Sequence, residues 1–287
     1  MTPTKDQIRE YYAAALERCL EGFSQLDERE WNKKGPKKDS GQWTAREHVA
    51  SLVGTMEKET MPLTRQAIAG EGPNIPGFAE RSDLTAFRQA TMEEVSDLPV
   101  GDLLQRMRAD YEEHIALLDT LSDADLDKPA NSPAWDRPGT LRDLFFASYL
   151  MLPGQYQDIR TVAKKKLPHW VEASPPEQVN FHMGRIFHYM PLIFHSEKEP
   201  DLKAGYQFTM DGDGGGQWAV EVEAGKASAQ TGALESFDIE IKTKPQHWVD
   251  LASGELNAAW AITTGKVKLG GNMGLAMKLG DLFSADS

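Results

Sequence analysis

The chain has 287 residues, 26% of them charged, and a formal net charge of −13 at pH 7. This length predicts about two domains. The acidic charge argues against a protein that binds the phosphate backbone of nucleic acids. The sequence has one cysteine, no leader of the basic-then-apolar type and no run of about 18 apolar residues. We therefore expect a cytoplasmic location and no integral membrane segment.

The first half of the chain carries four principal helical patterns, in which apolar residues recur every three or four positions. They cover residues 5–26, 42–59, 100–121 and 141–166. Thr44 and Glu47 have the spacing of a capping box at the start of the second pattern. A loop is expected over residues 32–41. Pro153 is expected to interrupt and kink the fourth helix, because proline has no amide hydrogen. The result is a predicted four-helix bundle over residues 1–168.

The second half changes from helical spacing to alternation. A linker with three prolines is expected over 167–176, and a helix from Glu177. Alternating apolar residues then predict strands whose inward side chains are Tyr206, Phe208 and Met210; Trp218, Val220 and Val222; and Phe237, Ile239 and Ile241. Glycines at 212–216 predict a hairpin turn. These features predict an α+β domain over 175–287 with an antiparallel sheet.

The last helix of the chain is unusual in being apolar around most of its circumference. Asn272 stands where an N-cap is expected, after a short alternating strand pattern at 266–269. Of the residues that follow, only Lys278 and Asp281 are charged before the end of the helix. Such a helix needs apolar partners on more than one side. It is either a core helix or one wall of an apolar cavity.

The stretch TGKVKLGGNMGLAMKLGDLF (264–283) resembles the C-terminal signature of the sterol carrier protein family. The resemblance extends upstream through FDIEIKTKPQHWVDLASGELNAAWAI (237–262) and GYQFTMDGDGGGQWAVEVEAGKASA (205–229). It implies an α+β fold in which a sheet and helices enclose an apolar tunnel for lipids.

The first half resembles the DinB-like bundle family, to which the N-terminal domain of mycothiol-dependent maleylpyruvate isomerase is related. The resemblance is carried by QWTARE (42–47), by TLRDL (140–144) and by Asp158-Ile159-Arg160. Many members of this family bind a divalent metal, and the positions of their ligands correspond here to Ser51, Met151 and Gln155. These side chains are poor ligands for such an ion. We expect no metal, no cofactor and no catalytic residue, and we interpret His48 and His114 as packing or solvent-facing histidines.

The function predicted from the two resemblances is non-enzymatic binding or transfer of a lipid, fatty acyl or sterol-like ligand in the C-terminal domain. The bundle would be a metal-free accessory domain. If the domain follows its family, the candidate wall residues of the tunnel are Phe187, Met190, Phe208, Trp218, Trp248, Ile262, Met273, Met277, Leu282 and Phe283.

Two other functions stay open at this point. The chain could be a thiol-dependent isomerase or transferase of the DinB-like superfamily. Alternatively, the second domain could be a scaffold or dimerisation module with a filled core. The expected partner is a hydrophobic small molecule or lipid rather than a nucleic acid, and self-association into a homo-oligomer is left open.

Overall fold

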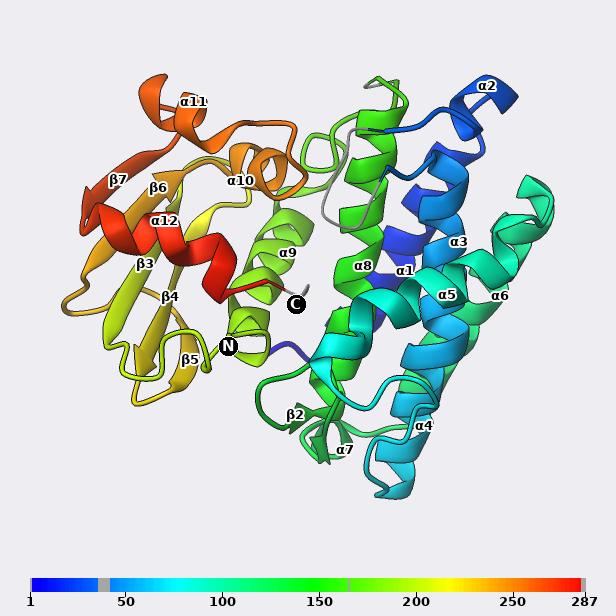
Figure 1. The fold of residues 1–287 in the computed structure, drawn as a ribbon, viewed down its shortest axis with the longest axis horizontal. Helices are drawn as coiled ribbons and strands as arrows, with labels where there is room; N and C mark the ends of the chain where they lie inside the picture. The colour runs from blue at the N-terminus through cyan, green and yellow to red at the C-terminus, as the bar shows by residue number, and fades with distance from the viewer. Residues whose placement is uncertain (1, 36–41, 165, 285–287) are drawn as a thin grey trace. The chain divides into compact units, whose positions relative to one another are not determined.

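The computed structural model describes residues 2–35, 42–164 and 166–284. The chain divides into two compact units (Figure 1). The bundle unit comprises Thr2–Ala134 and Pro138–Pro168. The sheet unit comprises Trp135–Arg137 and the chain from His169 onward. Residues 36–41, in the loop expected after the first helix, lie outside the described part.

The bundle unit is built from helices, with one very short strand pair. Its elements are α1 (Lys5–Phe23), α2 (Glu28–Trp31), α3 (Ala45–Thr55), the π-helical η1 (Met56–Thr60), α4 (Met61–Ala69), the 3₁₀ turn η2 (Arg81–Asp83), α5 (Leu84–Ser96), α6 (Val100–Asp119), α7 (Asp123–Leu126), β1 (Pro129–Ala130), β2 (Gly139–Thr140) and α8 (Leu141–Val162). Helices α1 and α3 each pack against both α6 and α8, which confirms the predicted bundle. Helix α5, outside this set of four, packs against α3.

Local sequence signals account for where the bundle helices begin and end. The predicted capping box is present at α3, where the Glu47 amide donates to Thr44 Oγ1 at 3.2 Å and the Thr44 amide donates to Glu47 Oε2 at 2.7 Å. The expected interruption at Pro153 is wrong, because α8 continues through it. Buried residues on both sides of the proline, among them Leu152 and Tyr156, pack this helix into the core. That packing outweighs the lost backbone hydrogen bond.

The sheet unit contains one five-stranded sheet and five helical segments. Its elements are α9 (Pro176–Tyr189), the 3₁₀ turn η3 (Met190–Leu192), β3 (Ala204–Met210), β4 (Gly216–Glu223), β5 (Lys226–Thr231), β6 (Ile239–Thr243), α10 (Pro245–Ala252), α11 (Ala258–Thr263), β7 (Lys268–Gly271) and α12 (Met273–Leu282). The strand order is β5-β4-β3-β6-β7. The predicted hairpin joins β3 to β4, where Met210 pairs with Gly216.

The sheet is mixed rather than antiparallel throughout, which corrects one feature of the predicted fold. Strands β3 and β6 run parallel, with Tyr206 opposite Ile239. After β5 the chain crosses over to the far side of β3 before it forms β6, so β6 has the same direction as β3. Alternation within each strand does not specify which strands pair, so the sequence pattern could not reveal this crossover.

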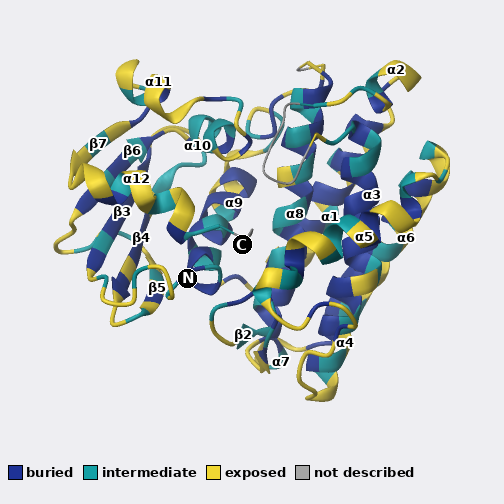
Figure 2. Cartoon of the chain, viewed as in Figure 1, coloured by how far each residue is buried: buried dark blue, intermediate teal, exposed yellow. Residues whose placement is uncertain are grey.

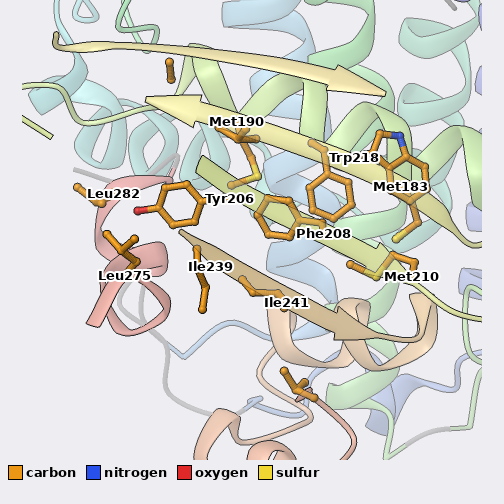
Figure 3. Packing of buried hydrophobic residues seen from close by; sticks show 14 of the residues in the cluster. Met183, Met190, Tyr206, Phe208, Met210, Trp218, Ile239, Ile241, Leu275 and Leu282 are labelled. Carbon is orange, nitrogen blue, oxygen red and sulfur yellow. The ribbon is translucent and has the colours of Figure 1, made fainter. Parts of the chain in front are cut away.

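The helices of the sheet unit bury one face of the sheet. Helix α9 packs on β4 and β5, and α12 packs on β6 and β7. Inward side chains of the strands form a continuous hydrophobic core with residues of these helices (Figure 3). On β3 this core contains the alternating residues Tyr206, Phe208 and Met210, as their spacing predicts.

The crossing of α3 and α5 gives a test of packing in the bundle unit. A Cβ added to Gly54 would lie 2.4 Å from the backbone oxygen of Thr91. We expect Gly54→Ala to lower the free energy of unfolding by about 1–3 kcal/mol, although alanine is the better helix former. Gly154 of α8 is the matched control, because nothing lies within 4 Å of its added Cβ. Gly154→Ala should be neutral or stabilise by up to about 1 kcal/mol in urea titrations. Equal effects of the two substitutions would contradict this account.

Candidate ligand-binding site

Four aromatic side chains occupy the centre of the sheet unit's core; we call Phe187, Phe208, Trp218 and Trp248 the aromatic cluster. The ring centroid of Phe187 lies 4.4 Å from that of Phe208 and 5.3 Å from those of Trp218 and Trp248. Phe208 and Trp248 meet edge to face at 5.4 Å. Three of the four rings are buried, and Trp248 is partly buried. The cluster is therefore an apolar centre shared by α9, two strands and α10.

A glycine brings α9 close enough to the sheet to form this centre. A Cβ on Gly184 would lie 3.3 Å from Trp218 Nε1, which is tighter than ordinary van der Waals contact. Gly184 is itself buried in α9, between turns that carry Met183 and Phe187. Helix α9 is amphipathic over these turns, and its apolar side faces the strands.

The ten candidate wall residues occupy three kinds of position. The buried ones belong to the core of the sheet unit: Phe187, Met190, Phe208, Trp218 and Leu282. The partly buried ones pack against that core: Trp248, Ile262 and Phe283. The remaining two, Met273 and Met277, are 48% and 77% exposed. The structure thus brings eight of the ten together in or against one hydrophobic core.

Helix α12 has one buried side rather than the two that its composition suggests. Leu275 and Leu282 are buried, whereas Met273 and Met277 lie on the exposed side. Figure 2 shows exposed residues along α12 and on the neighbouring α11. Trp260 of α11 is also exposed, and Lys266 Nζ lies 4.8 Å from the centroid of its ring. The two methionines are thus available to solvent in this structure.

Several buried residues with polar groups in the sheet unit are not among the ten candidate wall residues, and Tyr206 and His182 are two of them. Tyr206 is 0% exposed in the core, and its alternation with Phe208 on β3 is the sequence signal that could have indicated it. His182 of α9 is also buried, and desolvation lowers its pKa to about 3. Spacing alone could not reveal this burial. At neutral pH the imidazole of His182 is therefore uncharged, which suits an apolar interior.

In the bundle unit, one of the three positions that correspond to metal ligands of the DinB-like family, Gln155, is hydrogen-bonded to His48. His48 Nδ1 and Gln155 Oε1 are 2.6 Å apart, and the ring of Trp43 packs against His48 with centroids 5.4 Å apart. Ser51 is buried nearby on α3, and Met151 is partly buried on α8. A hydroxyl, a thioether and an amide engaged with a histidine do not fit a divalent metal. Within residues 2–35, 42–164 and 166–284, no group of three or more His, Cys, Asp or Glu is placed to hold one.

His114 lies in the core of the bundle unit, where both of its ring nitrogens are hydrogen-bonded. Tyr12 Oη lies 3.0 Å from Nδ1, and Thr64 Oγ1 lies 3.0 Å from Nε2. The ring also stacks on Phe145 with centroids 4.5 Å apart. Desolvation lowers the pKa of His114 to about 3. Of the two roles expected for His114, packing or facing solvent, the structure shows the first, and the ring is also a neutral hydrogen-bonding centre.

Comparison with known proteins agrees with this geometry. Residues 196–284 match the sequence profile of the SCP-2 sterol transfer family, so the C-terminal part of the chain is an SCP2 domain. Human "Sterol carrier protein 2" is 33% identical over 122 residues, covering 40% of this chain and 22% of that protein. "Peroxisomal multifunctional enzyme A" of Dictyostelium discoideum is 42% identical over 67 residues, covering 23% of this chain and 15% of that protein. The chain thus spans less than a quarter of these relatives.

Among solved structures, the fold matches that of the mycothiol-dependent maleylpyruvate isomerase. The TM-score is 0.60 at 10% identity, and the match covers 90% of this chain and 94% of that chain. At this identity the match shows a shared fold, a DinB-like helical region followed by an α+β region, and not a shared activity. No helix in the described part of the chain has the length and hydropathy needed to cross a membrane.

Two of the buried histidines, His114 and His182, predict how stability depends on pH. Their pKa of about 3 in the folded state lies below the ordinary value of 6.5, so below pH 6.5 the unfolded chain binds protons that the folded chain does not. Stability should therefore fall as pH drops from about 6.5 toward 3, by up to about 1.4 kcal/mol per pH unit for each histidine.

Chemical denaturation between pH 7 and pH 4.5 checks this expectation, with the two units followed separately. His114→Gln should flatten the pH dependence of the bundle unit and leave that of the sheet unit unchanged. His182→Gln should flatten the pH dependence of the sheet unit and leave that of the bundle unit unchanged. Each variant is therefore the control for the other. An unchanged slope in both variants would show that these histidines are not the responsible groups.

Proposed function

We propose that the SCP2 domain binds and transfers a hydrophobic ligand, and that it does so without catalysis. The observation that carries the proposal is the aromatic cluster at the centre of an apolar core, in a domain whose family is described as sterol transfer. The driving force is burial of hydrocarbon, worth about 0.8 kcal/mol per methylene before the entropy of association is subtracted. Such a mechanism needs few polar groups.

The proposed ligand contacts are the buried and partly buried candidate wall residues. They come from opposite sides of the core: Phe187 and Met190 from α9 and η3, Phe208 from the sheet, and Phe283 from the end of α12. The Phe283 ring lies 5.3 Å from Phe194, and the two residues also form a backbone bridge. Methionine and partly buried aromatic side chains adapt to ligands of different shape. Met273 and Met277 would contact a ligand only at its point of entry.

In this proposal the bundle unit is an accessory domain without a metal. The side chains at Ser51, Met151 and Gln155 support this, because they do not supply the imidazole or carboxylate ligands of a divalent metal, and Gln155 is hydrogen-bonded to His48. The compartment remains a prediction from the sequence, and so does the oligomeric state.

A second candidate function is a thiol-dependent isomerase or transferase. The observation that favours it is the fold shared with the mycothiol-dependent maleylpyruvate isomerase over most of both chains. The side chains at Ser51, Met151 and Gln155 oppose it, because they do not supply the nitrogen and carboxylate ligands of a catalytic metal.

Native mass spectrometry of the purified full-length chain separates the two functions. We expect a co-purifying hydrophobic molecule, identified after denaturing extraction, and no stoichiometric metal. A bound zinc or other divalent metal without a lipid would refute the proposal and favour the enzyme. The measurement also identifies the ligand class directly.

Substitution in the aromatic cluster tests where the ligand binds. Trp248→Leu keeps an apolar side chain but loses the ring contacts to Phe187 and Phe208. We expect it to weaken binding of an NBD-labelled sterol or fatty acid by about tenfold, which corresponds to about 1.4 kcal/mol. Phe237→Leu is the matched control, because Phe237 is 44% exposed outside the cluster. Equal affinities of the two variants would place the ligand elsewhere.

A further inference from the structure

The core of the SCP2 domain contains a buried hydroxyl that has no hydrogen-bond partner among the described residues. Tyr206 is 0% exposed, and its Oη has no donor or acceptor within hydrogen-bonding distance. A phenol that leaves water without a replacement hydrogen bond costs free energy. Phenylalanine would fill the same space without that cost. A hydrogen-bond partner from outside the chain would therefore offset the free energy that burial of this hydroxyl costs.

The surroundings of Tyr206 are apolar on the side where its hydroxyl lies. Its position on β3, two residues before Phe208, turns its side chain toward the core. Its ring meets Phe283 edge to face, with centroids 5.8 Å apart. In Figure 3 the hydroxyl end points toward the side of the cluster where Leu275 and Leu282 lie. Two of the candidate wall residues, Leu282 and Phe283, thus lie on the same side of the core as Tyr206.

The charges near Tyr206 limit what that partner can be. Burial, with a smaller contribution from the carboxylates of Glu199 and Asp238, raises the pKa of Tyr206 to about 12. Asp238 is held near the start of β3 because its Oδ2 accepts a 2.8 Å hydrogen bond from the Gly205 amide. The phenol therefore stays neutral at physiological pH. A ligand carboxylate beside the phenol would be repelled by Asp238, whereas the charge of Glu199 is paired with Lys278.

We propose that Tyr206 binds the polar end of the hydrophobic ligand, and that this end is a neutral hydroxyl or ester carbonyl rather than a carboxylate. The inference rests on the proposed function, since it assigns the ligand class of the same core. A phenol both donates and accepts, so it can hydrogen-bond to either group. The hydrocarbon body of the ligand would lie against the apolar side chains around Phe208 and the rest of the aromatic cluster.

Four probes with the same twelve-carbon chain test the chemistry of the polar end: dodecan-1-ol, methyl dodecanoate, dodecanoate and dodecane. Their affinities are measured by displacement of an NBD-labelled sterol from the full chain. We expect the alcohol and the ester to bind about tenfold more tightly than the carboxylate and the alkane, as one neutral hydrogen bond allows. In Tyr206→Phe this advantage should disappear, while the affinity for dodecane stays within about twofold.

Tyr111→Phe is the matched control. Tyr111 is likewise 0% exposed, and its Oη has no hydrogen-bond partner within the part of the chain that the structure describes, but it lies on α6 in the bundle unit. This variant should leave the affinities of all four probes unchanged. If both tyrosine variants changed them equally, the effect would be unspecific and the assignment of Tyr206 would be wrong.

The stability of the ligand-free protein supplies a second readout. Because Tyr206→Phe removes an unsatisfied group, it should raise the Tm of the delipidated protein by about 2–4 °C. A lower Tm would show that the hydroxyl has a structural partner, and that would overturn the proposal. Two binding results would also overturn it. In the first, each of the four probes binds to Tyr206→Phe as tightly as to the wild type. In the second, dodecanoate is the probe that the wild type binds most tightly. Failure of the wild type to bind any probe would instead refute the proposed function.

Discussion

A half-apolar sheet in water must have its apolar face covered, and most of the sheet unit is organised by this requirement. Alternation along β3 and β4 places Tyr206, Phe208 and Trp218 on the same face. Helices α9 and α12 cover that face, and α10 adds Trp248. The opposite face carries side chains such as Thr209, which is hydrogen-bonded to Glu240 across the sheet at 3.0 Å. A ligand taken up between sheet and helices would use the same apolar surface that stabilises the fold.

Two of the histidines buried in the two units are kept uncharged. His114 in the bundle and His182 in the sheet unit have pKa values lowered to about 3 by burial. A neutral imidazole costs much less to bury than a charged one, particularly when both nitrogens are hydrogen-bonded as in His114. The Tyr206 hydroxyl differs from His114 because it has no such partners among the described residues. A ligand that offers a hydrogen bond could therefore satisfy it.

In the bundle, the requirements of helix packing differ from those of a metal site. The overall arrangement matches that of the mycothiol-dependent maleylpyruvate isomerase, at only 10% identity. At the positions of the family's metal ligands, Gln155 is hydrogen-bonded to His48 and Ser51 packs in α3. Helix packing depends on apolar volume and spacing, whereas metal binding depends on a few specific atoms. A shared fold therefore does not by itself imply a shared metal site.

The sequence by itself determined the features that depend on neighbours along the chain. Helical periodicity, the capping box at Thr44 and the alternation on β3 are local, and each predicted its element correctly. The apolar core residues Phe187 and Phe208 also follow from periodicity, because a side chain's face is set by its position in the element. The signature around residues 264–283 added the family, since it is a motif of contiguous residues.

Only the tertiary structure decided the features that depend on contacts between distant segments. The parallel pairing of β3 with β6 arises from a crossover that alternation cannot encode. Helix α8 continues through Pro153 because it packs against other helices. Met277 is exposed because α12 buries only the side that carries Leu275 and Leu282. The unpartnered hydroxyl of Tyr206 is likewise invisible in the sequence, because a hydrogen bond is a matter of distance and orientation in the folded chain.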